Sequence, residues 1–298
     1  MSIAITAPGV SGSQRRAIFN VCAASFLFVV ASAIVKAVAP GIPVFEIALF
    51  RCAVGAVVLL PMLRGNGGLA ALRTRHPWAH FWRTSAGLVG MLGIYYGYAT
   101  LPLTTATALG FAMPLCLTLL AIPMLGERVG PGRMVAVLGG LAGVLVMLRP
   151  WSLGEAGRDG LPLVPVLSVM ASVVAWAFAM ISIRRMGAMG ERNITIVLYY
   201  SLGSAVLLAG LVVPVWVTPH GWTLVGLISV GGISAAAQML MTAGYRAGEP
   251  SLVAPFEYGA VVYTTILGGL IWGEIPDVWT LIGVVMLVAA GTVIWRKV

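Results

Sequence analysis

Long apolar runs alternate with short polar, proline-containing or glycine-containing breaks along the chain. A helix needs about 20 mostly apolar residues to cross a hydrocarbon core of about 30 Å, and the runs approach or meet that length. In lipid, only helices and closed barrels satisfy their own backbone hydrogen bonds. The pattern therefore predicts an all-α integral membrane protein of ten transmembrane helices, at approximately 17-38, 43-63, 80-100, 103-125, 131-148, 161-183, 193-215, 222-244, 250-272 and 276-295.

The basic residues between these runs predict how the chain crosses the membrane. With a cytoplasmic N-terminus, nearly all basic residues fall on the cytoplasmic side, the exceptions being Lys36, Arg51, Arg149 and Arg158. Cytoplasmic segments of membrane proteins are enriched in lysine and arginine. We therefore expect both termini in the cytoplasm of a multi-pass plasma membrane protein, which for a bacterial chain is the inner membrane. An even number of spans satisfies that arrangement.

An internal repeat divides the chain into two halves. A shift of 147 residues aligns Gly97 to Glu127, without a gap, with the segment ending at Glu274, and it places Ser25 on Ser172. Each half holds five spans, so the second copy enters the membrane from the other side, and such inverted repeats are the basis of alternating access. We expect a cytoplasmic tail at 1-16, a first five-helix repeat at 17-148, an extracytoplasmic linker at 149-160 and a second repeat at 161-296.

Composition narrows the classes of function. The chain is 60% hydrophobic and 9% charged, with a mean hydropathy of +1.00, whereas soluble domains carry about 25% charged residues. A soluble fold is excluded, and the net charge of +9 serves topology rather than nucleic-acid binding, so the lipid bilayer is the expected partner. Cys22, Cys52 and Cys116 lie in apolar runs without paired spacing, which favours packing roles over disulfides or metal binding.

Several short motifs carry a family resemblance. The chain has a Phe50-Arg51 pair in its second span, Leu125-Gly126-Glu127 after its fourth, and Trp272-Gly273-Glu274 after its ninth. With the five-plus-five layout, it resembles the drug/metabolite transporter superfamily, in the ten-helix branch with EamA-type repeats. Within that branch it is most similar to bacterial exporters of aromatic amino acids, with an exporter of another metabolite or drug as the alternative. With one further residue of shift in the second span, the copy has Tyr199 in place of Arg51, so a role for this arginine is not assumed to be symmetric.

Polar and aromatic side chains recur at helical spacing within several spans. A helix that faces a cavity places such residues three and four apart, whereas a helix surrounded by lipid has no need of them. Small and polar residues also serve close helix packing and cross-helix hydrogen bonding, which is the competing interpretation. On this basis the predicted substrate-binding residues in the first, third, sixth and eighth spans are Ser25, Ser32, Met91, Tyr95, Tyr98, Ser172, Trp176, Ser234 and Gln238.

The fourth and ninth spans add Phe111, Tyr258 and Glu257. An ionisable group at membrane depth is costly, so Glu257 is a candidate ligand for an amine or a candidate proton carrier. The alternative is a carboxylate near the cytoplasmic mouth that is hydrated or paired with Arg246. Gln238 and Glu257 lie at similar depths, and we expect them to share one polar patch. Arg51 and Lys36 are expected to snorkel toward the membrane surface.

No catalytic arrangement is recognisable in the sequence. His76, His80 and His220 fall in predicted loops, and neither an H-x-x-x-H pair nor a G-x-x-x-x-G-K phosphate loop occurs. We therefore predict a non-enzymatic secondary exporter without cofactor or metal, moving a small amphipathic, amino acid-like substrate by alternating access around a midplane cavity. A channel or a non-transporting membrane scaffold is the less favoured class. The oligomeric state stays open, a monomer being compatible with this pattern.

Overall fold

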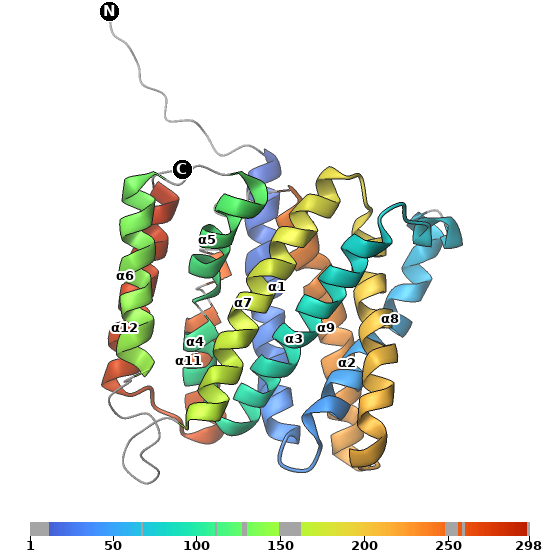
Figure 1. Cartoon of the computed structure of the whole chain (residues 1–298). Coiled ribbons are helices and arrows are strands. Elements are labelled where there is room, and N and C mark those ends of the chain that lie inside the picture. Colours follow the sequence, from blue (N-terminus) through green and yellow to red (C-terminus); the bar gives the residue numbers. More distant parts are fainter. Residues whose placement is uncertain are drawn as a thin grey trace, which may run out of the picture.

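The fold is a bundle of helices running roughly along one common direction (Figure 1). The computed structural model describes residues 12–66, 68–110, 112–126, 130–148, 162–247, 256–257 and 260–296. The α-helices of this part of the chain are α1 (Gly12–Val38), α2 (Val44–Leu59), α3 (Pro77–Thr100), α4 (Leu103–Gly110), α5 (Met113–Leu125), α6 (Pro131–Leu148), α7 (Leu163–Ala188), α8 (Asn193–Val212), α9 (Gly221–Ala247), α11 (Ala260–Trp272) and α12 (Val278–Arg296).

Short 3₁₀ segments occupy several connections. The α2–α3 connection contains η1 (Leu60–Asn66) and η2 (Gly68–Leu72), and η3 (Val213–Val215) follows α8. Within the described residues, six helical segments are long and apolar enough to cross a membrane: Gln14–Val38, Val44–Gly65, Thr105–Leu125, Leu163–Ala188, Asn193–Val215 and Gly221–Ala247. Shorter apolar helices cover Val262–Trp272 and Val278–Ala290. The all-helical membrane fold agrees with this pattern, while the count of ten spans stays a prediction.

The helix ends differ from the predicted ones in a few places. The helix α7 continues about one turn beyond the predicted end at 183, to Ala188, and α3 begins at Pro77, which places His80 in a helix rather than a loop. The predicted span at 103-125 is divided into α4 and α5. Pro114, at the start of α5, has no N–H to donate to the carbonyl four residues earlier. The helix therefore ends at Gly110 and begins again.

Close helix crossings hold the bundle together. The most extensive packing is that of α1 against α9 and of α3 against α7, followed by α6 against α12. Glycine permits the first two crossings, because a Cβ added at Gly244 would lie 2.7 Å from Val21 Cγ2, and one at Gly97 would lie 2.4 Å from Val169 Cγ2. Small residues at such positions let helices approach closely in membranes.

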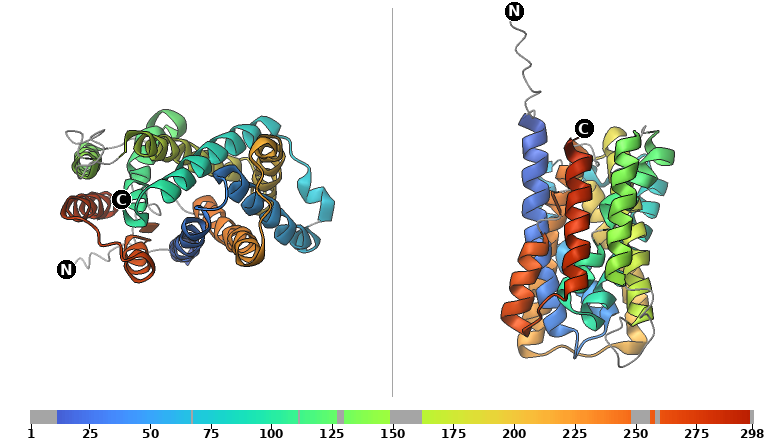
Figure 2. Two further views of the ribbon diagram at one scale, coloured as in Figure 1. Left: turned by 90° about the horizontal axis from the view of Figure 1, so that it is seen from below. Right: turned by 90° about the vertical axis from the view of Figure 1, so that its left-hand side faces the viewer.

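Two ends of the bundle can be distinguished. The helix α1 begins and α12 finishes at one end, called here the termini end, and α1 finishes at the opposite end (Figure 1). Seen along the bundle, α6 and α12 form a pair at one edge and α2 lies toward the other (Figure 2). The helices α1, α3, α4 and α7 lie between these edges, and the main cavity lies among them.

Candidate functional site

A cavity of about 130 Å³ lies in the middle of the bundle, with walls from α1, α2, α3, α4, α5, α7, α9, α11 and the short turn at Phe256 and Glu257. Its wall contains eight of the predicted substrate-binding residues: Ser25, Ser32, Met91, Tyr95, Tyr98, Ser172, Trp176 and Glu257. Residues that the sequence did not single out for binding complete it, among them Phe28, Arg51, Thr107, Met113 and Met241. The stripes at helical spacing on α1, α3 and α7 thus face a common space.

Aromatic rings form much of this wall. Phe28 and Trp176 meet edge to face, with ring centroids 6.1 Å apart and an interplanar angle of 87°. Tyr95 and Tyr98 lie one turn apart on α3, with centroids 6.3 Å apart. Such rings offer large apolar surfaces of defined orientation. An aromatic or aliphatic body can pack here without strong hydrogen-bonding demands.

The serines divide into two kinds. Ser32 donates to the carbonyl of Val29 at 2.8 Å, and Ser172 donates to that of Val169 at 2.7 Å, so both hydroxyls are satisfied within their own helices. The buried hydroxyl of Ser25 has no hydrogen-bond partner among the described residues. Buried polar atoms are normally paired. Ser25 is therefore the serine best placed to contact a solute.

Arg51 enters the cavity wall from α2 and is 5% exposed. It donates to the hydroxyl oxygen of Tyr200 at 2.9 Å and to the sulfur of Met91. Its guanidinium carbon lies 5.8 Å from the ring centre of Phe28 and 5.9 Å from that of Tyr95, which is within cation–π range. The expectation that Arg51 snorkels to the surface is wrong, because the side chain is buried and points inward.

Glu257 brings the opposite charge to the same cavity. Its carboxylate accepts a hydrogen bond from the hydroxyl of Tyr245, a fully buried side chain near the end of α9. The structure gives Glu257 no ion pair with Arg246 among the described residues. The predicted carboxylate at membrane depth is thus placed at the cavity, held by a tyrosine.

Ser234 and Gln238 lie outside the main cavity. They line a recess of about 10 Å³ beside it, together with Arg51 and Tyr200. Gln238 donates to Thr242 at 3.4 Å, one turn along the same helix. The predicted polar patch shared by Gln238 and Glu257 is not seen, because the amide lies on the Arg51 side and the carboxylate in the main cavity. Phe111 and Tyr258 fall outside the described residues.

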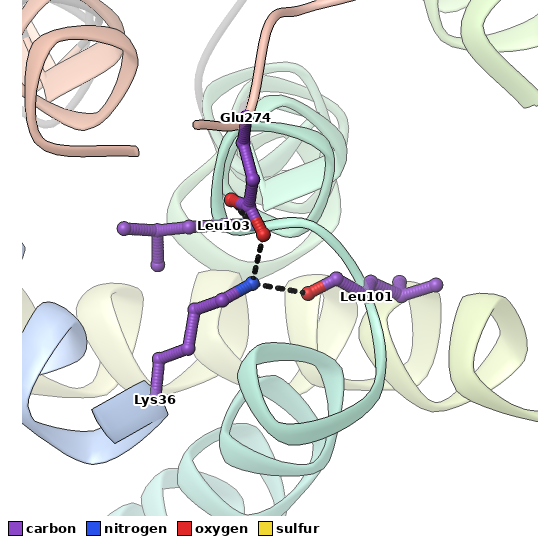
Figure 3. Close-up of polar contacts among 4 residues, drawn as sticks. All are labelled: Lys36, Leu101, Leu103 and Glu274. Atoms are coloured by element: carbon purple, nitrogen blue, oxygen red, sulfur yellow. Dashed lines mark hydrogen bonds and ion pairs between the residues drawn. The ribbon is translucent and has the colours of Figure 1, made fainter. Parts of the chain in front are cut away.

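An ion pair lies near the end of α1, opposite the termini, and Figure 3 shows its residues. Lys36 Nζ lies 2.5 Å from Glu274 Oε1 and donates to the carbonyl of Leu101 at 3.1 Å. The other carboxylate oxygen accepts from the backbone N–H of Leu103 at 2.9 Å. These contacts join α1, the α3–α4 turn and the α11–α12 connection. Lys36 was expected to snorkel, but it is tied to Glu274 one turn beyond the cavity residue Ser32.

The described residues contain no cluster of histidine, cysteine or acidic side chains that could hold a metal ion. His80 is buried and lies 3.4 Å from Glu191, away from the cavity wall. The site consists of aromatic walls and a few isolated polar groups, an arrangement that can bind and release a solute.

Comparison with known proteins identifies the kind of transporter. The model of the EamA-like transporter family matches residues 15–149 and again residues 163–296. The chain belongs to this family. It is a multi-pass membrane transporter of this family.

The curated relatives of this chain are named for several different substrates. The chain is 31% identical to a riboflavin transporter of Rhizobium johnstonii, over 80% of this chain and 76% of that one. It is 30% identical to an S-adenosylmethionine uptake transporter of Rickettsia prowazekii, over 83% and 81% respectively. A pseudopaline exporter of Pseudomonas aeruginosa is 29% identical, over 90% and 91%. These names do not support the closer resemblance to aromatic amino acid exporters.

The fold is shared with a solved structure described only as the crystal structure of a protein. That chain is 21% identical, superposes with a TM-score of 0.70, and is matched over 93% of this chain and 95% of its own. At this identity the likeness concerns the fold alone.

Proposed function

We propose that this EamA-family protein is a secondary transporter that exports a small amphipathic metabolite through the central cavity. The observation that carries the proposal is the cavity wall, in which rings of Phe28, Tyr95, Tyr98 and Trp176 surround a few polar groups. Aromatic or other hydrophobic amino acids are the class that fits best. Each well-placed aromatic pair contributes about 0.5–1.5 kcal/mol beyond buried area.

The names of the relatives are compatible with a ring-containing solute. Riboflavin and S-adenosylmethionine each contain an aromatic ring system, and these names occur among relatives near 30% identity. They are the specific alternatives to an amino acid substrate. The relatives are named for uptake as well as export, so the direction of transport rests on our proposal and needs its own measurement.

Alternating access is supported by the way the halves pack. Under the 147-residue correspondence, α1 corresponds to α7 and α3 to α9, so the crossing of α1 with α9 has its counterpart in the crossing of α7 with α3. These are the two most extensive helix contacts of the described bundle. A transporter built from such repeats exposes a central site alternately to the two sides as the halves exchange conformations. We propose that the ion pair of Lys36 with Glu274 helps to close one end of the bundle in one of these two states.

We further propose that the termini end faces the cytoplasm of a bacterial inner membrane, in accord with the distribution of arginine and lysine. A cysteine placed at Arg158 then reacts with an impermeant thiol reagent from outside intact cells. Labelling only after the membrane is permeabilised contradicts this orientation.

Counterflow in reconstituted vesicles tests the proposed function. Vesicles preloaded with unlabelled tryptophan or phenylalanine are expected to accumulate the labelled amino acid transiently and with saturation, which a carrier does and a channel does not. Riboflavin, S-adenosylmethionine and a sugar phosphate complete the panel. Counterflow of the sugar phosphate without that of any aromatic solute contradicts the proposal. Absence of flux for every solute favours the scaffold alternative.

A further inference from the structure

Arg51 is the one described cation whose side chain lines the main cavity. Burying a charge in a membrane protein is expensive, and such residues usually pair with a carboxylate or serve the transported solute. Within the described residues, Arg51 has no acidic partner within ion-pair distance. Its Nε is also buried without an acceptor in this part of the chain.

The groups around Arg51 hold the cation but do not neutralise it. A guanidinium has five N–H donors, whereas the acceptors that Arg51 meets are the Tyr200 hydroxyl and the Met91 thioether, the latter a weak acceptor. Three aromatic rings, those of Phe28, Tyr95 and Tyr200, lie within 6 Å of its guanidinium carbon, at 5.8 to 5.9 Å. They stabilise a positive charge by cation–π attraction and fix its position. Donor capacity is therefore left facing the cavity.

A second buried arginine strengthens the positive potential on this side. Arg83 is 2% exposed, its guanidinium carbon lies 4.4 Å from the ring centre of Tyr200, and it too lacks an ion pair among the described residues. Tyr200 thus contacts two guanidinium groups. Like charges in a low-dielectric interior repel each other strongly. An anionic group that binds beside Arg51 therefore lowers the electrostatic cost of burying the two guanidinium groups.

We propose that Arg51 binds a carboxylate of the transported solute, whose apolar body packs on Phe28, Tyr95 and Trp176. This inference rests on the proposed function and narrows it, because it requires an anionic group next to an aromatic or apolar one. Arg51 lies in both the main cavity and the recess with Ser234 and Gln238. These polar side chains are placed to support a carboxylate held at the boundary between the two spaces.

The experiment compares tryptophan with tryptophanamide as competitors of labelled tryptophan counterflow in vesicles. The two probes share the indole and the ammonium group, and only tryptophan has the carboxylate. We expect the wild-type protein to prefer tryptophan by about tenfold or more, as is typical when a charge-assisted hydrogen bond is lost. Arg51→Gln is expected to abolish the preference while the amide still competes.

Arg184→Gln is the control, since it also removes an arginine charge from the bundle, but Arg184 donates to the carbonyl of Arg246 and does not line the main cavity. It is expected to keep the wild-type preference, and monodispersity with thermal unfolding shows whether each variant folds. Equal competition by both probes in the wild type overturns the inference without any variant. An unchanged preference in folded Arg51→Gln also overturns it, and in both cases the proposed transport function stands. Absence of tryptophan counterflow in the wild type overturns this inference, and the proposed function fails with it when phenylalanine, riboflavin and S-adenosylmethionine show no counterflow either.

Discussion

The two halves of the chain share their packing positions but differ in chemistry. Under the 147-residue correspondence, Gly97 and Gly244 match, and each lies where its helix crosses a partner closely. Ser25 and Ser172 also match, and both line the cavity. The charges do not repeat: Glu257 corresponds to Gly110, and Arg51, in a span where the shift is one residue longer, corresponds to Tyr199. Each half thus supplies one charge to a common cavity.

This difference between the halves reflects two separate requirements on the duplicated sequence, namely close helix packing and recognition of the solute. Close crossings need small residues in both halves, because both must pack and move in the same way. A solute with distinct ends needs different groups at the two sides of its cavity. The two corresponding residues therefore have different environments. Tyr199 lies outside the cavity, where it donates to the carbonyl of Leu72 and its ring lies beside that of His80. Arg51 lines the cavity.

The largest effect on substrate preference is expected from removal of the Glu257 charge, which the second half supplies. Glu257→Gln should lower the preference for tryptophan over indole-3-propionate, which lacks the ammonium group, by about 10- to 100-fold if the carboxylate binds that group. If Glu257 instead carries a proton, counterflow persists and accumulation driven by a pH gradient disappears. Competition and gradient-driven transport in vesicles distinguish the two roles.

Glu46→Gln is the control for this charge. Glu46 is a fully buried carboxylate that accepts from the backbone N–H of Val217 and does not line the cavity. Its loss should leave both the preference and the pH response unchanged. Wild-type behaviour of Glu257→Gln in both measurements would remove Glu257 from the site.

The matched glycines should respond alike. Gly97→Ala and Gly244→Ala each place a Cβ within 2.7 Å or less of a valine methyl group across a helix crossing. Overpacking of this kind costs about 1–3 kcal/mol. Thermal unfolding in detergent should show similar losses for both variants, whereas Gly232→Ala, with open space around the added Cβ, should be near neutral. A loss in only one half would argue against equivalent crossings.

A smaller effect is expected from the ion pair that closes one end. Lys36 has no charged counterpart in the second half, where Ile183 takes its place. Lys36→Gln or Glu274→Gln should favour opening at this end, and a partly exposed pair of this kind is worth on the order of 1 kcal/mol. In a background without native cysteines, a cysteine at Ser32 should then react several-fold faster with an impermeant thiol reagent. Unchanged reactivity relative to the Glu46→Gln control would contradict a closing role.

Hydropathy alone predicted the helical segments well, because lipid demands long apolar helices. The division of α4 from α5 was signalled by Pro114, although the residue at which the helix ends was not. The inward face of α1, α3 and α7 was visible from polar and aromatic residues at helical spacing. The positions of these side chains in one cavity follow from that periodicity.

The error on Arg51 has a physical cause. Its depth was estimated from the distance to the helix end, but snorkelling depends on the direction of the side chain around the helix axis, and α2 is apolar on nearly all sides. The same reasoning from depth alone placed Gln238 beside Glu257. Their separation depends on how α9 is rotated against its neighbours, which packing decides. The sequence signal that could have marked Arg51 as a cavity residue was the Phe50-Arg51 pair, which belongs to the family resemblance.

The central claim is that the transported solute occupies the cavity between α1, α3 and α7. A cysteine at Ser25, in a background with alanine at the three native cysteine positions, tests it directly. Tryptophan at concentrations that saturate counterflow should slow alkylation of this cysteine by N-ethylmaleimide several-fold, since Ser25 lies in the cavity wall and has no partner among the described residues. Alkylation at the same rate with and without saturating tryptophan, in a variant that still transports it, would contradict the account.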